Sequence, residues 1–285
     1  MDNPLSRLAP QLFGEYPKPF VDLIDNLSLS PDQDINEVKG LLWKAYEFGN
    51  HYHEGQKRLS GKPYFSHCVA VANTLASWKM DVTTIIAGLL HDTVEDTDAT
   101  LEEITKTFGD DLGHLVDGLT KISEITYSSR REKQAGNFMK MLLSVAQDLR
   151  VVIIKFADRL HNMETIKYMP RIKRHRIAIE TRDIYVPLAH RLGMSAVKSQ
   201  LEDLVFSVLN PTGYKEMESS IKSSKKQREK FIKKVIKPVK NELEKYDIIP
   251  QVYGRAKSYS SIYGKMMTRD KSFDEIYDLY AIRII

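Results

Sequence analysis

The stretch from residue 87 to residue 97, AGLLHDTVEDT, joins an apolar run to an imidazole and three carboxylates. The apolar residues lead directly into His91 and Asp92, and Glu95 and Asp96 follow one turn later. Because positions four apart share a face of a helix, we expect Glu95 beside His91 and Asp96 beside Asp92. Carboxylates at this density repel one another unless a cation or shared protons offset their charge. The stretch therefore predicts either a divalent-metal site or a solvated acidic helix end.

Two more residues complete a ligand set if packed helices bring them close. His67 lies near the start of the preceding expected helix, one helical hairpin away from His91. Asp158 follows an apolar run and stands among basic residues, so it is either a ligand or the ion-pair partner of a basic neighbour. Taken alone, His67 is more often a core histidine. Together, His67, His91, Asp92 and Asp158 offer two nitrogens and two oxygens, which suits Mn²⁺, Fe²⁺ or Zn²⁺. We interpret His161, His175 and His190 as structural and leave His51 and His53 out of the site.

Helical periodicity accounts for nearly all of the first ~210 residues, which predicts an all-helical domain. A helix capped by Asp81 runs into His91, and Thr100 opens a capping box for a helix that Gly109 ends. Glycine and proline predict a loop over 58–64 and a turn over 210–213. The other expected helices cover residues 19–27, 35–52, 65–80, 111–123, 130–146, 151–168, 172–191 and 197–209.

The composition changes after residue 213. Residues 215–240 hold ten Lys or Arg and three Asp or Glu, and we expect one long basic helix over 214–246. A solvated connecting helix is the preferred interpretation over a nucleic-acid surface. Strand-like segments follow at 248–254 and 279–285, with a short helix at 260–267. Because two strands alone cannot bury a sheet face, we expect an α+β domain that continues beyond this chain.

The sequence thus predicts three parts: a helical domain over 1–210, a basic linking helix over 211–246 and the start of an α+β domain over 247–285. Across 285 residues, 42% are hydrophobic and 28% are charged, as in soluble globular proteins. The single cysteine, Cys68, excludes an intrachain disulfide and favours a reducing compartment. No secretory leader or membrane-length apolar run is evident, so we expect a cytoplasmic protein without membrane contact.

Longer motifs give this pattern a family resemblance. The order His, His-Asp, Asp resembles the HD superfamily of metal-dependent phosphohydrolases. Five motifs resemble the hydrolase domain of RelA/SpoT-type alarmone enzymes: GKPYFSH (61–67), HDTVEDT (91–97), VDGLTK (116–121), KFADRLHNM (155–163) and PLAHRLG (187–193). Three more resemble the opening of that family's nucleotidyltransferase-like synthetase domain: GRAK (254–257), SSIYGKM (260–266) and IYDLYAIR (276–283).

The resemblance implies hydrolysis of (p)ppGpp to GDP or GTP and pyrophosphate, with one Mn²⁺ held by His67, His91, Asp92 and Asp158. Glu95 and Asp96 would orient or deprotonate the attacking water, or protonate the leaving 3′ oxygen. The residues matching the guanine-nucleotide site are Arg58, Ser60, Tyr64, Asn162 and Thr165. Asn162 and Thr165 also share a helical face with Asp158. Leu59 stands where family members that also make the alarmone often carry a second basic residue.

In the second domain, the resemblance implies that Arg255, Lys257 and Lys265 bind ATP phosphates and that Asp278 binds Mg²⁺. The family's further synthetase residues would follow Ile285, so we expect no synthesis by this chain. Two other functions stay open: an HD phosphohydrolase acting on another nucleotide, and a regulatory nucleotide-binding module. The presence of all six candidate metal and catalytic residues argues against a silent module. Contact with nucleic acid or the ribosome is not evident in the sequence.

Overall fold

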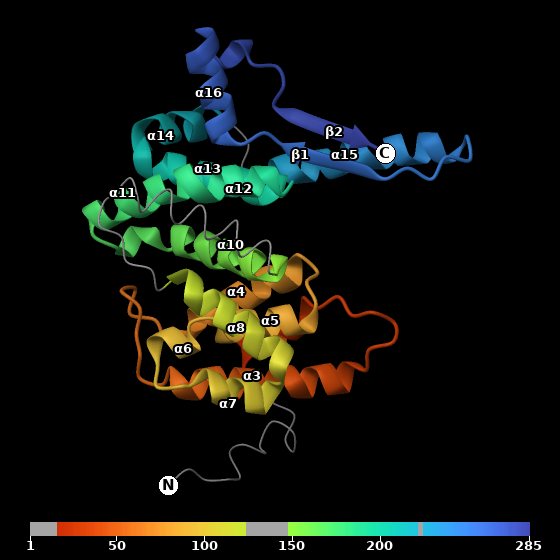
Figure 1. Ribbon diagram of the computed structural model, residues 1–285. Coiled ribbons are helices and arrows are strands. Elements are labelled where there is room, and N and C mark those ends of the chain that lie inside the picture. The colour runs from red at the N-terminus through yellow and green to blue at the C-terminus, as the bar shows by residue number, and fades with distance from the viewer. Residues whose placement is uncertain (1–15, 124–147, 222–224) are drawn as a thin grey trace. The chain divides into compact units, whose positions relative to one another are not determined.

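The computed structural model describes residues 16–123, 148–221 and 225–285 of the chain (Figure 1). The helix expected over 130–146 lies outside the described residues. The chain forms two compact units, Met1–Pro170 and Arg171–Ile285. The domain boundary expected at residue 210 falls inside the second unit and stays a prediction.

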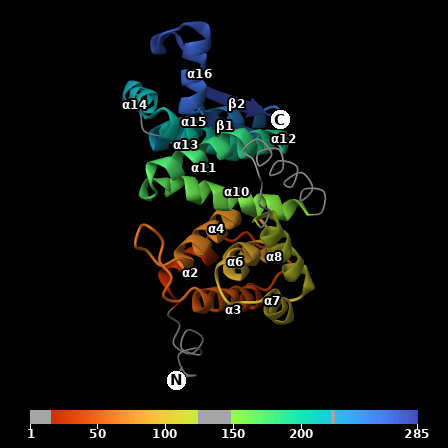
Figure 2. The same ribbon diagram turned by 60° about the vertical axis from the view of Figure 1, so that its left-hand side comes forward.

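The first unit is built from helices, which confirms the mainly α fold class. Its elements are α2 (Lys18–Asp25), α3 (Ile35–Tyr52), α4 (Phe65–Ser77), α5 (Val82–Leu90), α6 (Thr93–Asp96), α7 (Leu101–Phe108), α8 (Asp110–Ser123), α10 (Leu149–Glu164) and the 3₁₀ turn η1 (Ile166–Tyr168). Figure 2 shows the same elements from a second direction. In the described residues of this unit, β pairing is limited to an isolated bridge between Lys57 and Pro63.

Helix α5 is the centre of this unit because its sequence, VTTIIAGLL, is apolar on nearly every side. Seven of its residues, Thr84 to Leu90, are buried, and the helix packs against α3, α4, α8 and α10. Gly88 permits a close approach to α4, since a Cβ there would lie 2.4 Å from Cδ1 of Leu75. The residues that follow α5 are therefore held in place by the core.

The helix boundaries follow the capping signals of the sequence. The Asp81 side chain accepts a hydrogen bond from the Thr84 amide at the start of α5. Thr100 and Glu103 form the expected capping box of α7, and Gly109 adopts a φ of 95° between α7 and α8. These three predictions are confirmed.

The second unit contains most of the remaining helices and both strands. Its elements are α11 (Arg171–Glu180), the π-helical turn η2 (Thr181–Tyr185), α12 (Val186–Arg191), α13 (Ser195–Leu209), α14 (Pro211–Ser220), α15 (Lys225–Glu244), β1 (Val252–Ala256), α16 (Tyr259–Arg269), the 3₁₀ turn η3 (Phe273–Glu275) and β2 (Tyr280–Ile284). The helix expected over 172–191 is present, but a π turn interrupts it just before Pro187. Proline lacks the amide that the α-helical pattern needs, and the wider turn accommodates that loss.

The structure differs from the sequence-based expectation around residue 210. The residues Asn210 to Gly213, expected to form a turn, begin a helix instead. Asn210 accepts a hydrogen bond from the Gly213 amide, and Pro211 occupies the first helical turn, where its missing amide costs little. Where one helix over 214–246 is expected, the structure has α14 and α15.

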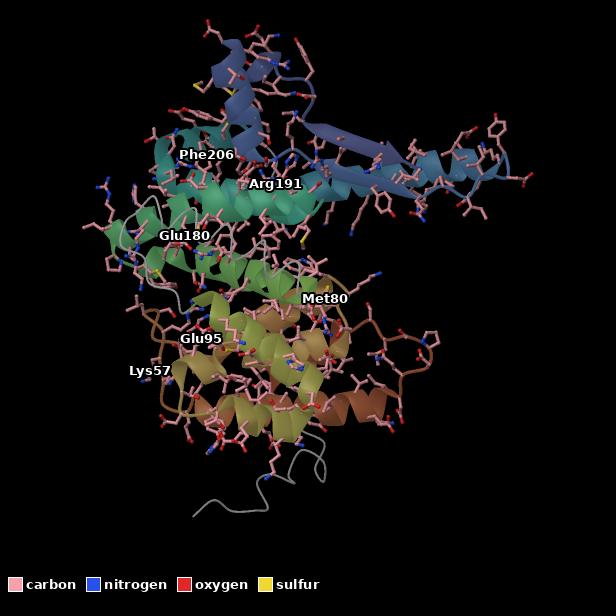
Figure 3. The ribbon with its side chains drawn as sticks, in the orientation of Figure 1. Lys57, Met80, Glu95, Glu180, Arg191 and Phe206 are labelled. Atoms are coloured by element: carbon pink, nitrogen blue, oxygen red, sulfur yellow. The ribbon has the colours of Figure 1, made fainter. Side chains whose placement is uncertain are left out.

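The strands pair as an antiparallel ribbon, in which Val252 lies opposite Ile284 and Ala256 opposite Tyr280. All five residues of β2 are exposed. A separate small core lies under α14 and α16, where the rings of Phe206 and Tyr263 lie 4.9 Å apart between centroids. Figure 3 labels Phe206 among the side chains of the chain. Within the described residues, no helix combines the length and apolarity needed to cross a bilayer.

Candidate metal centre

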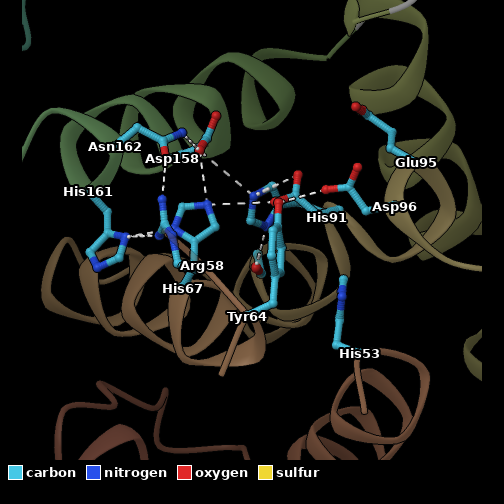
Figure 4. A network of polar contacts seen from close by, with 12 residues as sticks. His53, Arg58, Tyr64, His67, His91, Glu95, Asp96, Asp158, His161 and Asn162 are labelled. Atoms are coloured by element: carbon cyan, nitrogen blue, oxygen red, sulfur yellow. Dashed lines mark hydrogen bonds and ion pairs between the residues drawn. The ribbon is translucent and has the colours of Figure 1, made fainter. Parts of the chain in front are cut away.

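Four side chains from three helical elements of the first unit converge on one point (Figure 4). His67 lies near the start of α4, His91 and Asp92 directly follow α5, and Asp158 lies on α10. Nε2 of His67 is 3.1 Å from Oδ1 of Asp158 and 3.6 Å from Oδ2 of Asp92. Nε2 of His91 is 3.1 Å from Oδ1 of Asp92 and 3.9 Å from Oδ1 of Asp158. The structure thus brings together all four expected ligands.

His91 presents a nitrogen that needs a partner. Its Nδ1 lies 2.9 Å from the Gly88 carbonyl oxygen, to which it donates, so Nε2 of the neutral ring carries the lone pair. The side chain is fully buried, and Nε2 makes no hydrogen bond within the described part of the chain. The nearby Asp92 oxygen is close but not aligned for one. A buried unpaired acceptor between carboxylates fits a bound divalent cation.

The charges at the site are consistent with that fit. Burial would raise the pKa of Asp158, but the hydrogen bond and charge of His67 lower it to about 2. Burial also opposes ionisation of Asp92, yet the neighbouring His91 holds the pKa of that carboxyl below its usual range. Burial lowers the pKa of His67, whereas Asp92 overcomes burial and raises the pKa of His91. Two carboxylates at this point therefore require a positive charge, which a bound cation would supply.

His161, interpreted from the sequence as structural, contacts this centre directly. Its Nδ1 lies 2.6 Å from Nδ1 of His67 and 3.0 Å from Nη1 of Arg58. Burial, with the charges of His67 and Arg58, lowers the pKa of His161 to about 4, so its ring is a neutral acceptor at pH 7. A proton on Nδ1 of His67 that points at His161 leaves Nε2 of His67 free for a cation. The signal was its position three residues after Asp158, on the same helical face.

The acidic pair lies beside the centre, on a separate turn of helix. The sequence suggests one helix through His91, but α5 ends at Leu90 and α6 begins at Thr93. The Asp96 amide still donates to the Asp92 carbonyl oxygen at 2.9 Å, so these two residues remain adjacent, as expected. Glu95 instead contacts Lys155, a buried lysine whose Nζ lies 3.7 Å from Oε1 of Glu95.

Tyr64 joins the metal centre to the acidic pair. Its hydroxyl lies 2.8 Å from Oδ2 of Asp92 and 2.6 Å from Oδ2 of Asp96. Burial and these two carboxylates raise the pKa of Tyr64, so the phenol stays protonated and acts as a donor. Figure 4 shows Asp96 directed at Tyr64. One side chain of the expected nucleotide loop therefore orients both an expected ligand and an expected catalytic carboxylate.

The rest of that loop holds Arg58 over α10. The bridge between Lys57 and Pro63 and a φ of 81° at Gly61 close the loop tightly. Nη2 of Arg58 donates to Oδ1 of Asn162 at 2.8 Å, and Asn162 donates in turn to Asp158. The two remaining expected residues contribute no side-chain contact to this cluster within the described residues: Ser60 is half-buried in the loop, and the Thr165 hydroxyl donates to the His161 carbonyl oxygen.

Two residues outside the predicted set support this arrangement. His53 is buried at the end of α3, and its ring stacks on Tyr64 with centroids 5.0 Å apart and planes 14° apart. Its Nδ1 lies 2.8 Å from Oε1 of Gln56, whose Nε2 donates to the Asp96 carbonyl oxygen at 2.7 Å. The sequence offered only the spacing of His53 and Gln56 before the loop as a signal.

The expected synthetase-like residues form a second cluster in the second unit. Lys257 Nζ lies 2.5 Å from Oδ2 of Asp278, and Lys265 contacts the same oxygen. Arg255 lies on β1, and no ion pair joins it to this cluster within the described residues.

Comparison with known protein families identifies the family of the chain. Residues 45–195, more than half of the chain, match the model described as "HD domain". The chain belongs to the HD-domain family. The four converging residues lie within this HD domain. Residues 254–285 match the "Region found in RelA / SpoT proteins", which confirms the resemblance stated from the motifs.

Curated relatives carry names from the same group. The chain is 45% identical over 258 residues to a GTP pyrophosphokinase of Myxococcus xanthus, covering 90% of this chain and 34% of that protein. It is 41% identical over 255 residues to the bifunctional (p)ppGpp synthase/hydrolase SpoT of Escherichia coli K12, covering 90% and 36%. A guanosine-3′,5′-bis(diphosphate) 3′-pyrophosphohydrolase of Spiroplasma citri is 45% identical over 260 residues, covering 91% and 34%. The chain therefore spans about a third of the length of these relatives.

One solved structure shows a weaker likeness. It is described as "A metazoan ortholog of SpoT hydrolyzes ppGpp and plays a role in starvation responses", and it aligns with a TM-score of 0.49 at 24% identity. The alignment covers 63% of this chain and 97% of that chain. A likeness of this degree does not identify the fold by itself.

Proposed function

We propose that this chain is a Mn²⁺-dependent hydrolase that releases pyrophosphate from the 3′ position of (p)ppGpp. The observation that supports this most is the buried, unpaired Nε2 of His91, placed among His67, Asp92 and Asp158. Three relatives whose names include GTP pyrophosphokinase and ppGpp hydrolase indicate the substrate class. The finer points, Mn²⁺ as the native ion, a role in the stringent response and a cytoplasmic location, belong to the same proposal.

His67, His91, Asp92 and Asp158 would hold the ion. A divalent ion bound there lowers the pKa of a bound water and neutralises charge that develops on the phosphate. In the overall hydrolysis, a water oxygen bonds to the phosphorus next to the 3′ oxygen, and that oxygen leaves with a proton as pyrophosphate is released. The chain must therefore accept one proton and donate another.

Asp96 is the better-placed group for the proton from water. Tyr64 fixes one oxygen of Asp96 beside the ligand Asp92. A carboxylate held in this way is pre-oriented for general base work. Glu95 is tied to Lys155 by an ion pair, so its charge serves best to orient groups around the site.

Arg58 is placed to bind the substrate's phosphates. Its contacts within the described residues, His161 Nδ1 and Asn162 Oδ1, are neutral acceptors, so its charge is not offset by a carboxylate. A guanidinium whose charge no carboxylate offsets is suited to binding an incoming phosphate oxygen. Asn162 contacts Arg58, and Ser60, Asn162 and Thr165, which the family resemblance assigns to the guanine-nucleotide site, would contact the ribose or base.

The test is the release of GDP and pyrophosphate from ppGpp by the purified chain with Mn²⁺. We expect chelation to abolish release and added Mn²⁺ to restore it more fully than Mg²⁺ or Zn²⁺. Comparable turnover of dGTP or a cyclic nucleotide would favour a different HD phosphohydrolase. A protein that binds guanine nucleotide but no metal, by elemental analysis, would instead be a regulatory module.

A further inference from the structure

Cys68 is the only cysteine of the chain, and it lies against the metal centre. It directly follows His67 on α4 and is fully buried. Its Sγ, one ring nitrogen of His91 and one carboxylate oxygen of Asp92 all lie within 4.8 Å of one another. The ligand atoms of His67, His91 and Asp158 meet the same limit. The centre therefore contains two overlapping ligand sets that share His91.

The shared residue supplies the second observation. His91 is completely buried, and its Nε2 has no hydrogen-bond partner within the described residues. His91 and Asp92 both belong to the four residues proposed to hold Mn²⁺, so an ion bound by Cys68, His91 and Asp92 would occupy two of those ligands. The two sets also differ in chemistry. The imidazoles and carboxylates of the first set suit Mn²⁺, Fe²⁺ or Zn²⁺, whereas the thiolate of the second set favours a softer ion such as Zn²⁺.

We propose that Cys68, His91 and Asp92 form a binding site for a thiophilic divalent cation, which excludes the activating ion from the centre. A small closure of the three ligand atoms would give the usual distances of about 2.3 Å from Zn²⁺ to sulfur and about 2.0 Å to nitrogen and oxygen. The thiol proton passes to solvent as the ion binds. Water would complete a tetrahedral shell. The inhibition that follows rests on the proposed hydrolase function, whereas the binding itself does not.

A spectroscopic experiment tests the binding on the whole chain, without any substrate. Cd²⁺ is the probe, because a cadmium–thiolate bond gives an ultraviolet charge-transfer band and the chain has a single thiol. We expect one equivalent of Cd²⁺ to produce the band in the wild-type chain, and Cys68→Ser and Cys68→Ala to lack it. Circular dichroism of both variants verifies that they are folded. A folded wild-type chain that takes up Cd²⁺ without the band overturns the proposal.

A second experiment tests whether the thiophilic cation excludes the activating ion from the centre. With ppGpp hydrolysis sustained by a fixed Mn²⁺ concentration, Zn²⁺ should inhibit the wild-type chain in competition with Mn²⁺. Loss of the sulfur ligand in Cys68→Ala should raise the Zn²⁺ concentration for half inhibition at least about tenfold. Equal Zn²⁺ sensitivity of the two proteins overturns the exclusion. If neither protein releases GDP under any condition, the proposed function fails, and the Cd²⁺ spectrum still decides the presence of the site.

Discussion

Two clusters of charged residues in this chain have opposite surroundings. The first, here called the buried cluster, consists of His67, His91, Asp92 and Asp158, in which both histidines are at most 1% exposed. The second, the exposed cluster, consists of Lys257, Lys265 and Asp278, and the side chain of Asp278 is 52% exposed. Water screens the exposed cluster, whereas the buried cluster must balance its charges internally. Burial is what makes a cation necessary at the first cluster and optional at the second.

The secondary-structure elements that carry the two clusters also differ in burial. The buried cluster stands on α4, α5 and α10, whose apolar residues belong to a core that also includes residues of α2, α3, α7 and α8. The exposed cluster lies beside a two-stranded ribbon in which β2 is entirely exposed. We therefore expect substitutions at the buried cluster and its core to have large effects, and matched substitutions at the exposed cluster to have small ones.

The largest difference is expected from removing one charged group in each cluster. His91→Ala removes a proposed ligand, so ppGpp hydrolysis should fall roughly a thousandfold and bound Mn²⁺ should be lost. Asp278→Ala should leave hydrolysis within about twofold of the wild type. Steady-state rates and elemental analysis measure both effects. If Asp92→Ala kept full metal binding and rate, the ligand set would be incorrect.

The cores should differ in stability in the same way. Leu75→Ala leaves a cavity under α5, and we expect it to lower the free energy of unfolding by about 2–5 kcal/mol. Ile284→Ala, at a half-exposed position on β2, should lower it by less than about 0.5 kcal/mol. Urea unfolding followed by circular dichroism compares the two. Equal losses of unfolding free energy in the two variants would show that side chains of the β1–β2 ribbon pack in a hydrophobic core.

The buried cluster was largely predictable from the sequence, because its ligands lie at positions that helical spacing and capping residues define. The apolar run before His91 and the one before Asp158 each indicate a buried helix that ends in a polar group. The contacts of His161, His53 and Cys68 were not predictable, since each depends on which side chain of a neighbouring element it meets. The same limit applies at Asn210, where one side-chain bond to a backbone amide converts an expected turn into a helix start.

Tyr64, which contacts Asp92 of the buried cluster, offers an intermediate effect. Tyr64→Phe keeps the ring but removes the hydroxyl that donates to Asp92 and Asp96, so hydrolysis should fall about 10- to 100-fold. Because Asp92 loses a donor that orients it, the Mn²⁺ concentration for half activation should rise as well. Tyr168→Phe, at an exposed tyrosine of the same unit, is the matched control. A loss of rate with unchanged Mn²⁺ dependence would confine the role of Tyr64 to Asp96.

The smallest expected effect is a pH dependence of stability that depends on His161. In the metal-free folded chain its pKa is lowered to about 4, below the usual 6.5, because burial and neighbouring positive charge disfavour the protonated ring. The unfolded chain therefore takes up a proton at His161 as pH falls through 6.5, while the folded chain does not until about 4. The free energy of unfolding therefore decreases as pH falls from 6.5 to about 4. His161 causes no such loss above this pH range.

His161→Gln retains a side-chain acceptor but does not titrate, so it isolates this contribution. In the chelated protein, the variant should lose less unfolding free energy between about pH 7 and pH 5 than the wild type does. His51→Gln, at an exposed histidine on α3, should follow the wild type. Urea unfolding at the two pH values gives the comparison. Identical slopes for wild type and His161→Gln would mean that His161 takes up its proton over the same pH range in the folded chain as in the unfolded chain, which contradicts its lowered pKa.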